Sequence, residues 1–166
     1  PNFERIGDYA TNMVELAQRL QSENAAFSDM AKKELALITQ AVNEILEITV
    51  DAFSKDDNEA AKAIEPLEET IDDMIMMLKD RHTKRLKNGQ CSIASGLVFM
   101  EALTYFERAS DQCSSIAVMM LARHNEQILQ NHYEYLREIH AGNDVAYLAE
   151  KDRRREQYIK PLKQIF

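Results

Sequence analysis

A short acidic motif occurs twice in this chain, over residues 3–8 and again over residues 106–111. Both copies begin with Phe-Glu-Arg and end with Asp, so each carries a glutamate and an aspartate in an i, i+4 relationship. Residues at that spacing share one face of a helix, where two carboxylates repel each other unless a positive charge lies between them. The carboxylates in question are Glu4, Asp8, Glu107 and Asp111. The repetition predicts a duplicated helical unit that holds cations.

The apolar neighbours of these carboxylates bear on the same question. Each glutamate directly follows a phenylalanine, so both pairs border the apolar stripe of their helix. A carboxylate at such an edge is partly desolvated, which favours a bound cation or an arginine partner. The alternative is a solvated surface on which Arg5 and Arg108 form salt bridges with the acids. Spacing alone leaves both interpretations open.

A third acidic segment in the middle of the chain contains two further i, i+4 pairs. Asp72 follows an apolar residue, as Glu107 does, so we expect Asp72 to be a ligand, with its pair partner Glu68 as a weaker candidate. Helices that pack about 8–10 Å apart would bring Asp72 and Glu107 to one shared ion. For the second pair, Glu69 and Asp73, we expect a hydrated helix face.

The candidate ligands define the class of site. They offer only carboxylate oxygen, which suits hard divalent cations such as Mg, Ca or Mn and also iron. A ferritin-like di-iron oxidase needs Glu-x-x-His pairs on facing helices, and no histidine of this chain has an acid three residues before it. Neither a nucleophile elbow nor a glycine-rich phosphate loop occurs. We therefore expect a protein that is not an enzyme, and if it binds a metal, the ligands are carboxylates.

The composition predicts a single helical domain. The chain has 166 residues with only four Gly and three Pro, and so few helix breakers favour long helices. The net charge of −8 argues against a nucleic-acid partner, because nucleic acids bind basic surfaces. The longest apolar run, residues 116–122, is too short to span a bilayer, which takes about 20 residues. The two cysteines form no CxxC motif and are expected to be reduced thiols.

Apolar residues that recur at spacings of three and four indicate helices throughout. The expected helices cover residues 3–20, 31–52, 60–78, 97–136 and 145–165. No alternating apolar pattern bounded by turn residues indicates a strand. The predicted fold is all-α, an elongated helical bundle.

Cap and breaker residues set the expected helix ends. Ser28 and Ser92 are expected N-caps, and Asp56 followed by Glu59 resembles a capping box. Pro66 predicts a kink or a late start in the third helix, because proline has no N–H to donate.

The motifs together resemble a known family. Residues 4–8 with Asn12, and residues 107–111, are similar to the signature of PhoU domains, which are duplicated three-helix bundles whose E-x-x-x-D motifs hold multinuclear metal clusters. The segments 82–86 and 89–91 further resemble the PhoU-like cytosolic tail of bacterial sodium/phosphate cotransporters. The resemblance implies the metal ligands Glu4, Asp8, Glu107 and Asp111, with Asp72 and Glu68 as weaker candidates.

The resemblance also implies an organisation and a role. Residues 1–21 are the last helix of an incomplete first repeat, residues 28–123 are a second three-helix repeat, and residues 124–166 are a helical extension. The implied role is a regulatory domain that follows the membrane part of a sodium-dependent phosphate transporter in the same chain, at the cytoplasmic face of the plasma membrane. The orphan first helix predicts a homo-oligomer. The arginines at 153–155 are expected on a solvated face, with an anionic membrane surface as the alternative partner.

Two other interpretations stay open. A stand-alone PhoU-type signalling protein would bind a sensor kinase or a phosphate importer. A helical interaction scaffold would bind no metal, and elemental analysis of protein purified without chelator would separate it from the other two.

Overall fold

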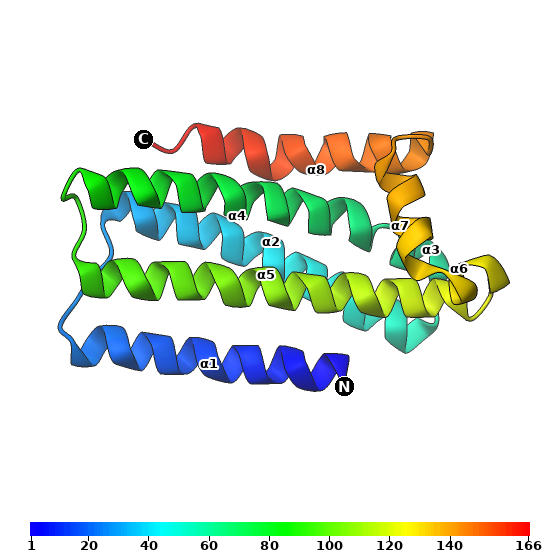
Figure 1. Ribbon diagram of the computed structural model, residues 1–166, viewed down its shortest axis with the longest axis horizontal. Coiled ribbons are helices and arrows are strands. Elements are labelled where there is room, and N and C mark those ends of the chain that lie inside the picture. Colours follow the sequence, from blue (N-terminus) through cyan, green and yellow to red (C-terminus); the bar gives the residue numbers. More distant parts are fainter.

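The computed structural model describes residues 1–166 and contains helices without any strand, which confirms the predicted all-α class. Eight helices follow one another along the chain (Figure 1). They are α1 (Asn2–Ser22), α2 (Asp29–Lys55), α3 (Asn58–Lys62), α4 (Ile64–Lys87), α5 (Ile93–Ala122), α6 (Glu126–Gln130), α7 (His132–His140) and α8 (Val145–Lys163). No helix combines the length and the apolar character that a membrane crossing requires.

The long helices α2, α4 and α5 form the centre of the bundle and share one hydrophobic core. Helix α8 lies against α4, and α1 runs along the outer side of α5 in the opposite direction (Figure 1). The short helices α6 and α7 cover the end of the bundle at which α5 stops. Fully buried side chains from these three helices and from α8 meet inside, among them Ile45, Leu67, Ile71, Phe99 and Tyr158. Burying each such side chain contributes about 1.5–3 kcal/mol.

Local sequence signals set several helix starts as predicted. Ser28 and Ser92 cap α2 and α5, because each hydroxyl accepts a hydrogen bond from a backbone N–H of the first turn. Pro66 lies in the first turn of α4, where an N–H would have no intrahelical partner. The predicted late start is therefore confirmed, since α4 begins at Ile64 after a break at Ala63.

The expected capping box before α3 is displaced by one residue. Asp57, and not Asp56, is the N-cap, and its carboxylate accepts hydrogen bonds of 3.0 Å from the N–H groups of Glu59 and Ala60. Asp56 instead ends α2 in a left-handed conformation, with φ at 52°. Aspartate tolerates that conformation better than most residues do.

The expected continuation of α5 to Leu136 is wrong. Helix α5 ends at Ala122, and Asn125 then caps α6 through its side-chain oxygen. Asn131 caps α7 in the same way a few residues later. Asparagine favours such caps because its side chain competes with helical backbone hydrogen bonds. The chain therefore turns back over the end of the bundle before α8 begins.

Helix α8 is fixed to the bundle by charged side chains that point inward. Arg154 is only 3% exposed and binds Glu44 on α2, and the hydroxyl of Tyr158 donates to the same carboxylate. Arg155 forms an ion pair with Asp73 on α4. The expectation of a solvated face at residues 153–155 is therefore wrong for Arg154, because α8 turns this side chain toward α2.

The apolar stripe of α1 is rotated from its predicted position. Leu16 is the one buried residue of α1, and Ile6, Met13 and Leu20 lie beside it, partly buried. Phe3, which the predicted stripe includes, is 39% exposed. Because α1 contacts the bundle almost only through α5, only the residues that face this one helix are covered.

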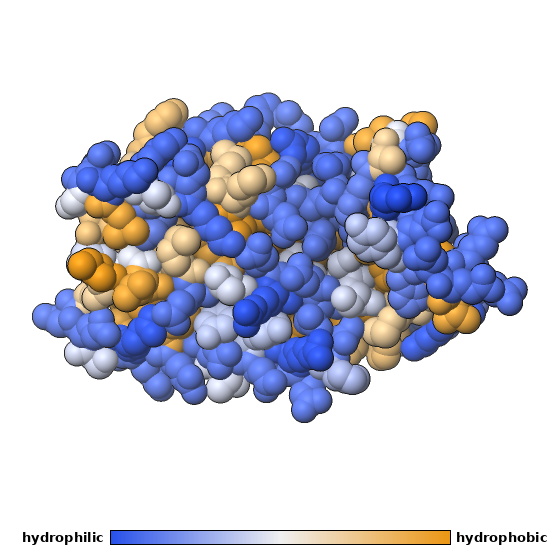
Figure 2. Space-filling view, viewed as in Figure 1, coloured by the Kyte–Doolittle hydropathy of each residue, from blue (hydrophilic) through white to orange (hydrophobic).

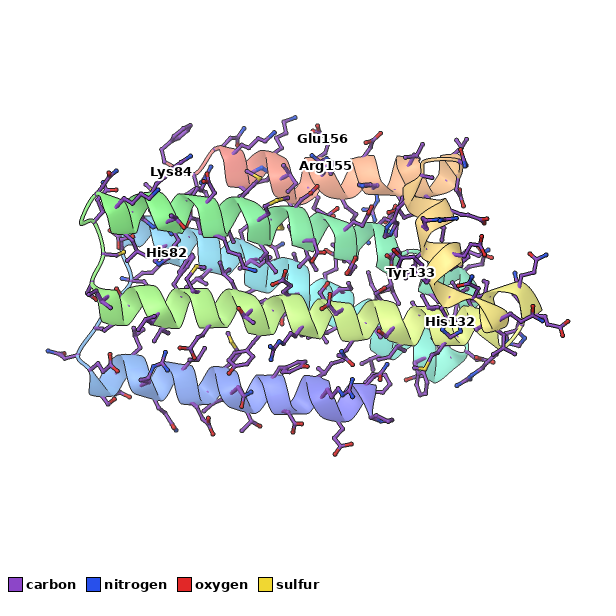
Figure 3. The ribbon with its side chains drawn as sticks, in the orientation of Figure 1. His82, Lys84, His132, Tyr133, Arg155 and Glu156 are labelled. Atoms are coloured by element: carbon purple, nitrogen blue, oxygen red, sulfur yellow. The ribbon has the colours of Figure 1, made fainter.

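His82 lies near the end of α4, beside the turn into α5 (Figure 3), and Gly96 on α5 packs against it. His82 is 2% exposed and stacks on Phe99, with 4.7 Å between the ring centroids. A Cβ added at Gly96 would lie 3.0 Å from Leu86 Cδ2 and 3.2 Å from His82 Nε2. Glycine at this position allows the two helices to approach each other.

Beside that contact lies a buried ion cluster. The side chain of Glu34 on α2 is fully buried and forms ion pairs with Arg85 at 2.8 Å and with Arg81 at 3.2 Å. Arg81 also donates a 3.0 Å hydrogen bond to the carbonyl oxygen of Ile165, beyond the end of α8. One arginine therefore joins α4, α2 and the C-terminal residues.

The viewed surface is mostly hydrophilic, with apolar patches near the end where α4 turns into α5 (Figure 2). Exposed apolar residues of that turn and of the first part of α5 include Leu86, Ile93 and Leu97. Leu97 is 57% exposed. Cys91 and Cys113 are both free, as predicted.

Candidate metal centre

Three carboxylates converge between α4 and α5. Glu68 and Asp72 lie one turn apart on α4, and Asp111 reaches them from α5. One oxygen of each lies within 4.8 Å of the others, a separation that a single cation can bridge. These residues come from two of the four acidic pairs that the sequence singles out.

The surrounding core fixes the rotation of α4 that creates this convergence. Leu67, Ile71 and Met74 are fully buried on the core side of the helix. Because residues one position away are turned by about 100°, Glu68 and Asp72 then lie at the edge of the core that faces α5. Helix α5 runs antiparallel to α4 and presents Asp111 at the same height.

The cluster is electrostatically strained when no cation is present. Glu68 is only 8% exposed, and its burial, together with the charges of Glu65 and Asp72, raises its pKa to about 9. Burial and the nearby charge of Asp111 raise the pKa of Asp72 to about 6. Burial and the charge of Glu107 also raise the pKa of Asp111. A proton or a metal ion would relieve this repulsion, and the oxygen-only donor set fits a hard cation or iron.

Glu107 lies close to the cluster but has a different partner. Its carboxylate accepts a 2.7 Å hydrogen bond from the ammonium group of Lys79 on α4. The expected pairing of Asp72 with Glu107 is therefore replaced by one of Asp72 with Asp111, one turn further along α5. Glu107 therefore faces Lys79 on α4, and not Asp72.

Glu4 and Asp8 are not brought to this cluster. Both are exposed on α1, and no other acid joins them in a group with ligand spacing. The rotation of the α1 stripe explains their position, because contact through Leu16 and Ile6 leaves both carboxylates at the surface.

A second polar group on α4 has no counterpart among the predicted residues. Glu65 is 7% exposed and accepts a 2.5 Å hydrogen bond from Ser114, and His140 Nε2 lies 2.8 Å from its other oxygen. Glu69 binds Lys151 at 2.6 Å and the hydroxyl of Tyr147. The hydrated face expected for Glu69 is therefore wrong, because α7 and α8 cover it.

Sequence spacing contains part of the signal for this second group. Glu65 precedes Glu69 by one turn, as Glu68 precedes Asp72, so α4 carries two parallel acidic stripes. The partners of the outer stripe come from α7 and α8, which are distant in sequence. The positions of α7 and α8 depend on the turns after α5. The spacing of residues within α4 therefore cannot predict these partners.

Comparisons with known proteins agree on one family. Residues 35–120 match the PhoU domain, and this segment contains all three converging carboxylates. The chain is 23% identical over 145 residues to a protein of Thermotoga maritima described as "Phosphate-specific transport system accessory protein PhoU homolog 1". That alignment covers 87% of this chain and 60% of the relative, so the chain spans about three fifths of the relative's length. No solved structure matches the chain.

Proposed function

The chain belongs to the PhoU domain family, and from that premise we propose that it is a regulator of phosphate uptake that binds a metal cation through Glu68, Asp72 and Asp111. The observation that carries the proposal is the convergence of these carboxylates inside the segment that matches the family. The similarity of the chain to a protein described as a phosphate-specific transport system accessory protein supports the link to phosphate.

We propose that the chain acts as a PhoU-type regulator of the stand-alone kind. The relative is described as an accessory protein of a transport system, which favours this form over a domain fused to a sodium/phosphate cotransporter. The motifs at 82–86 and 89–91 are the observation in favour of the fused form. Sequencing the gene upstream of Pro1 distinguishes the two, because the fused form requires several apolar segments of about 20 residues.

The proposed mechanism uses the arrangement of α4 and α5. A bound divalent cation would offset the negative charge of the cluster, in place of the proton that the raised pKa of Glu68 favours. Glu68 and Asp72 would hold the cation from α4, and Asp111 would hold it from α5. A cation held by residues of both helices would strengthen the contact between α4 and α5. We propose that this change in the bundle, and not catalysis, is what a transport partner senses.

A metal titration with two double variants tests the proposal. Chelator-treated protein is titrated with Mn²⁺, Mg²⁺ or Fe²⁺ under anaerobic conditions and followed by calorimetry and thermal unfolding. At a metal concentration about 100 times Kd, binding stabilises the folded protein by about 2.7 kcal/mol. We expect Glu68→Gln/Asp111→Asn to abolish both signals and Glu4→Gln/Asp8→Asn to retain them.

The second double variant is a matched control, because it neutralises the same number of acids on an exposed helix surface. Equal metal binding by Glu68→Gln/Asp111→Asn and the unmodified protein would contradict the site. Loss of binding in both variants would show that net charge, and not this cluster, determines affinity.

A further inference from the structure

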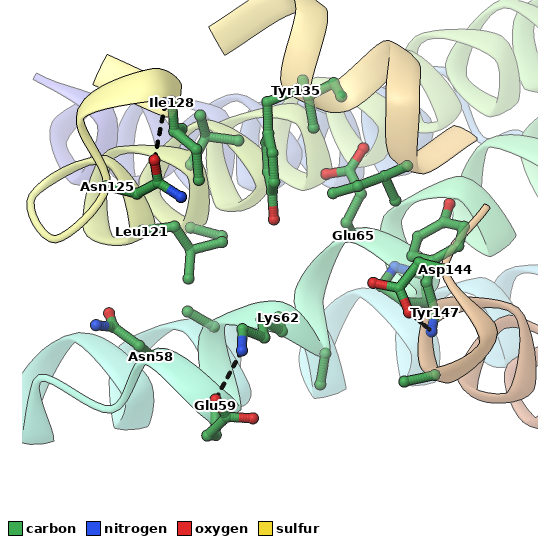
Figure 4. Close-up of a pocket in the computed structure, with 18 of the residues that line it drawn as sticks. Asn58, Glu59, Lys62, Glu65, Leu121, Asn125, Ile128, Tyr135, Asp144 and Tyr147 are labelled. Atoms are coloured by element: carbon green, nitrogen blue, oxygen red, sulfur yellow. Dashed lines mark hydrogen bonds and ion pairs between the residues drawn. The ribbon is translucent and has the colours of Figure 1, made fainter. Parts of the chain in front are cut away.

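A cavity of about 720 Å³ lies where α6, α7 and α8 fold back over the bundle (Figure 4). Its walls come from α3, the start of α4, the end of α5 and all three later helices. All three later helices lie beyond residue 120, where the match to the PhoU domain ends. Of the 20 lining residues, 11 lie beyond that point.

The cavity has the size and lining of a small-molecule site. Pockets for small ligands measure about 300–1,000 Å³ and combine apolar walls with a few placed polar groups. Of the 20 residues that line this one, 11 are hydrophobic. Leu121 of α5 and Ile128 of α6 form part of the apolar wall (Figure 4).

Four acids and a single lysine line the cavity, so its charged groups are mainly negative. Asp144 uses one carboxylate oxygen to cap α8 through a 3.0 Å bond from the Tyr147 N–H, and it has no ion-pair partner. The nearest lysine in the lining, Lys62, is already paired with Glu59 at 2.7 Å (Figure 4). The Oδ1 atom of Asn58 is buried without a hydrogen-bond partner.

The phenol of Tyr135 points into the space between these groups (Figure 4). Burial raises its pKa, and the charges of Glu65 and Asp144 raise it further. The charges of both carboxylates are therefore felt at the Tyr135 phenol, which lines the cavity. This negative charge disfavours phosphate and other anions and favours a cation.

We propose that this cavity binds an organic cation, in which an ammonium or guanidinium group pairs with Asp144 while an apolar body lies against Leu121 and Ile128. The ligand class follows from the combination of a carboxylate without an ion-pair partner and an apolar wall in one cavity. A hydrated metal ion would leave the apolar wall unused, and an anion would face Asp144 and Glu65. The proposal concerns a site separate from the carboxylate cluster between α4 and α5.

Three probes of similar shape and different charge test the ligand class. Phenethylamine, phenylethanol and phenylacetate are titrated into the full chain and followed by protein-observed NMR. We expect the amine to bind at least tenfold more tightly than the alcohol, with shifts in the cavity residues, and the carboxylate to produce no saturable shift. An alcohol that binds as tightly as the amine would overturn the proposal.

Two aspartate variants test the position of the counter-ion. Asp144→Asn removes the charge but retains an N-cap for α8, since asparagine caps as well as aspartate does. We expect it to weaken amine binding at least tenfold, while Asp152→Asn, at an exposed position of the same helix, leaves the affinity unchanged. Unchanged affinity in Asp144→Asn, or an equal loss in both variants, would refute the assignment.

Discussion

At the scale of single residues, two glycines in helices have opposite surroundings. Gly96 on α5 faces Leu86 and His82 at a close interhelical contact, whereas Gly7 on α1 has nothing within 4 Å of an added Cβ. Glycine lowers helix stability by about 1 kcal/mol relative to alanine when nothing else intervenes. Replacement by alanine should therefore change the free energy of unfolding in opposite directions at the two positions.

We expect Gly96→Ala to lower the free energy of unfolding by about 1–3 kcal/mol. The new methyl group would lie 3.0 Å from Leu86 Cδ2, and the His82 ring cannot withdraw because it is stacked on Phe99. Urea denaturation followed by circular dichroism measures the change. Stability equal to that of the unmodified protein would mean that the contact between α4 and α5 is looser than described.

We expect Gly7→Ala to raise the free energy of unfolding by about 0.5–1 kcal/mol, because the site is an open helix interior. The same denaturation experiment serves both variants. Gly7→Ala is also the control for Gly96→Ala, because it shows the effect of alanine in a helix without a close neighbour. A decrease would indicate that α1 has an unrecognised close partner at this position.

At the scale of the helices, the sequence predicts those helix ends that are capped by a nearby side chain. It does not predict features that depend on how two helices pack. Ser28 and Ser92 act within their own first turn, and the sequence shows them directly. The choice of Asp111 over Glu107 depends on how far α4 and α5 slide along each other. A shift of one turn changes the partner without altering any periodicity, so the sequence could name the acids but not pair them.

The contact of α8 with Glu44 on α2 is also set by helix packing, and it makes the stability of the fold depend on pH. Burial acts to raise the pKa of Glu44, but hydrogen bonds from Tyr158 and Arg154 outweigh it and lower the pKa below its ordinary value. An acid with a lowered pKa in the folded state stabilises the fold at neutral pH. That contribution disappears as the pH falls through the folded-state pKa.

We therefore expect Glu44→Gln to cost about 1 kcal/mol of stability at pH 7 and to flatten the loss of stability between pH 5 and pH 3. Chemical denaturation at a series of pH values measures both effects. Glu47→Gln, one turn away at an exposed position of α2, is the matched control. Identical pH profiles for the two variants would contradict the role of Glu44.

At the scale of the whole molecule, α1 has an uncovered side. It packs mainly on α5, and its small and apolar residues Gly7, Ala10, Val14 and Ala17 are exposed in a row with spacings of three and four. Val14 itself is 57% exposed. Such a stripe can pack closely against a second helix.

We predict that the chain self-associates through this stripe at tens of micromolar. Val14→Lys should shift sedimentation velocity toward the monomer, because it places a charge within the stripe. Thr11→Lys adds the same charge beside the stripe and should have little effect. A monomer for the unmodified chain at this concentration would refute the prediction.

The bond from Arg81 to the carbonyl oxygen of Ile165 has a practical consequence. Because Arg81 is held by Glu34, the last residues are clamped to the bundle although Phe166 itself is 92% exposed. A fluorophore attached at Phe166 would tumble with the protein and not swing on a loose tail. Its anisotropy, or energy transfer to a second dye on α1, would therefore report directly on movements of the helices.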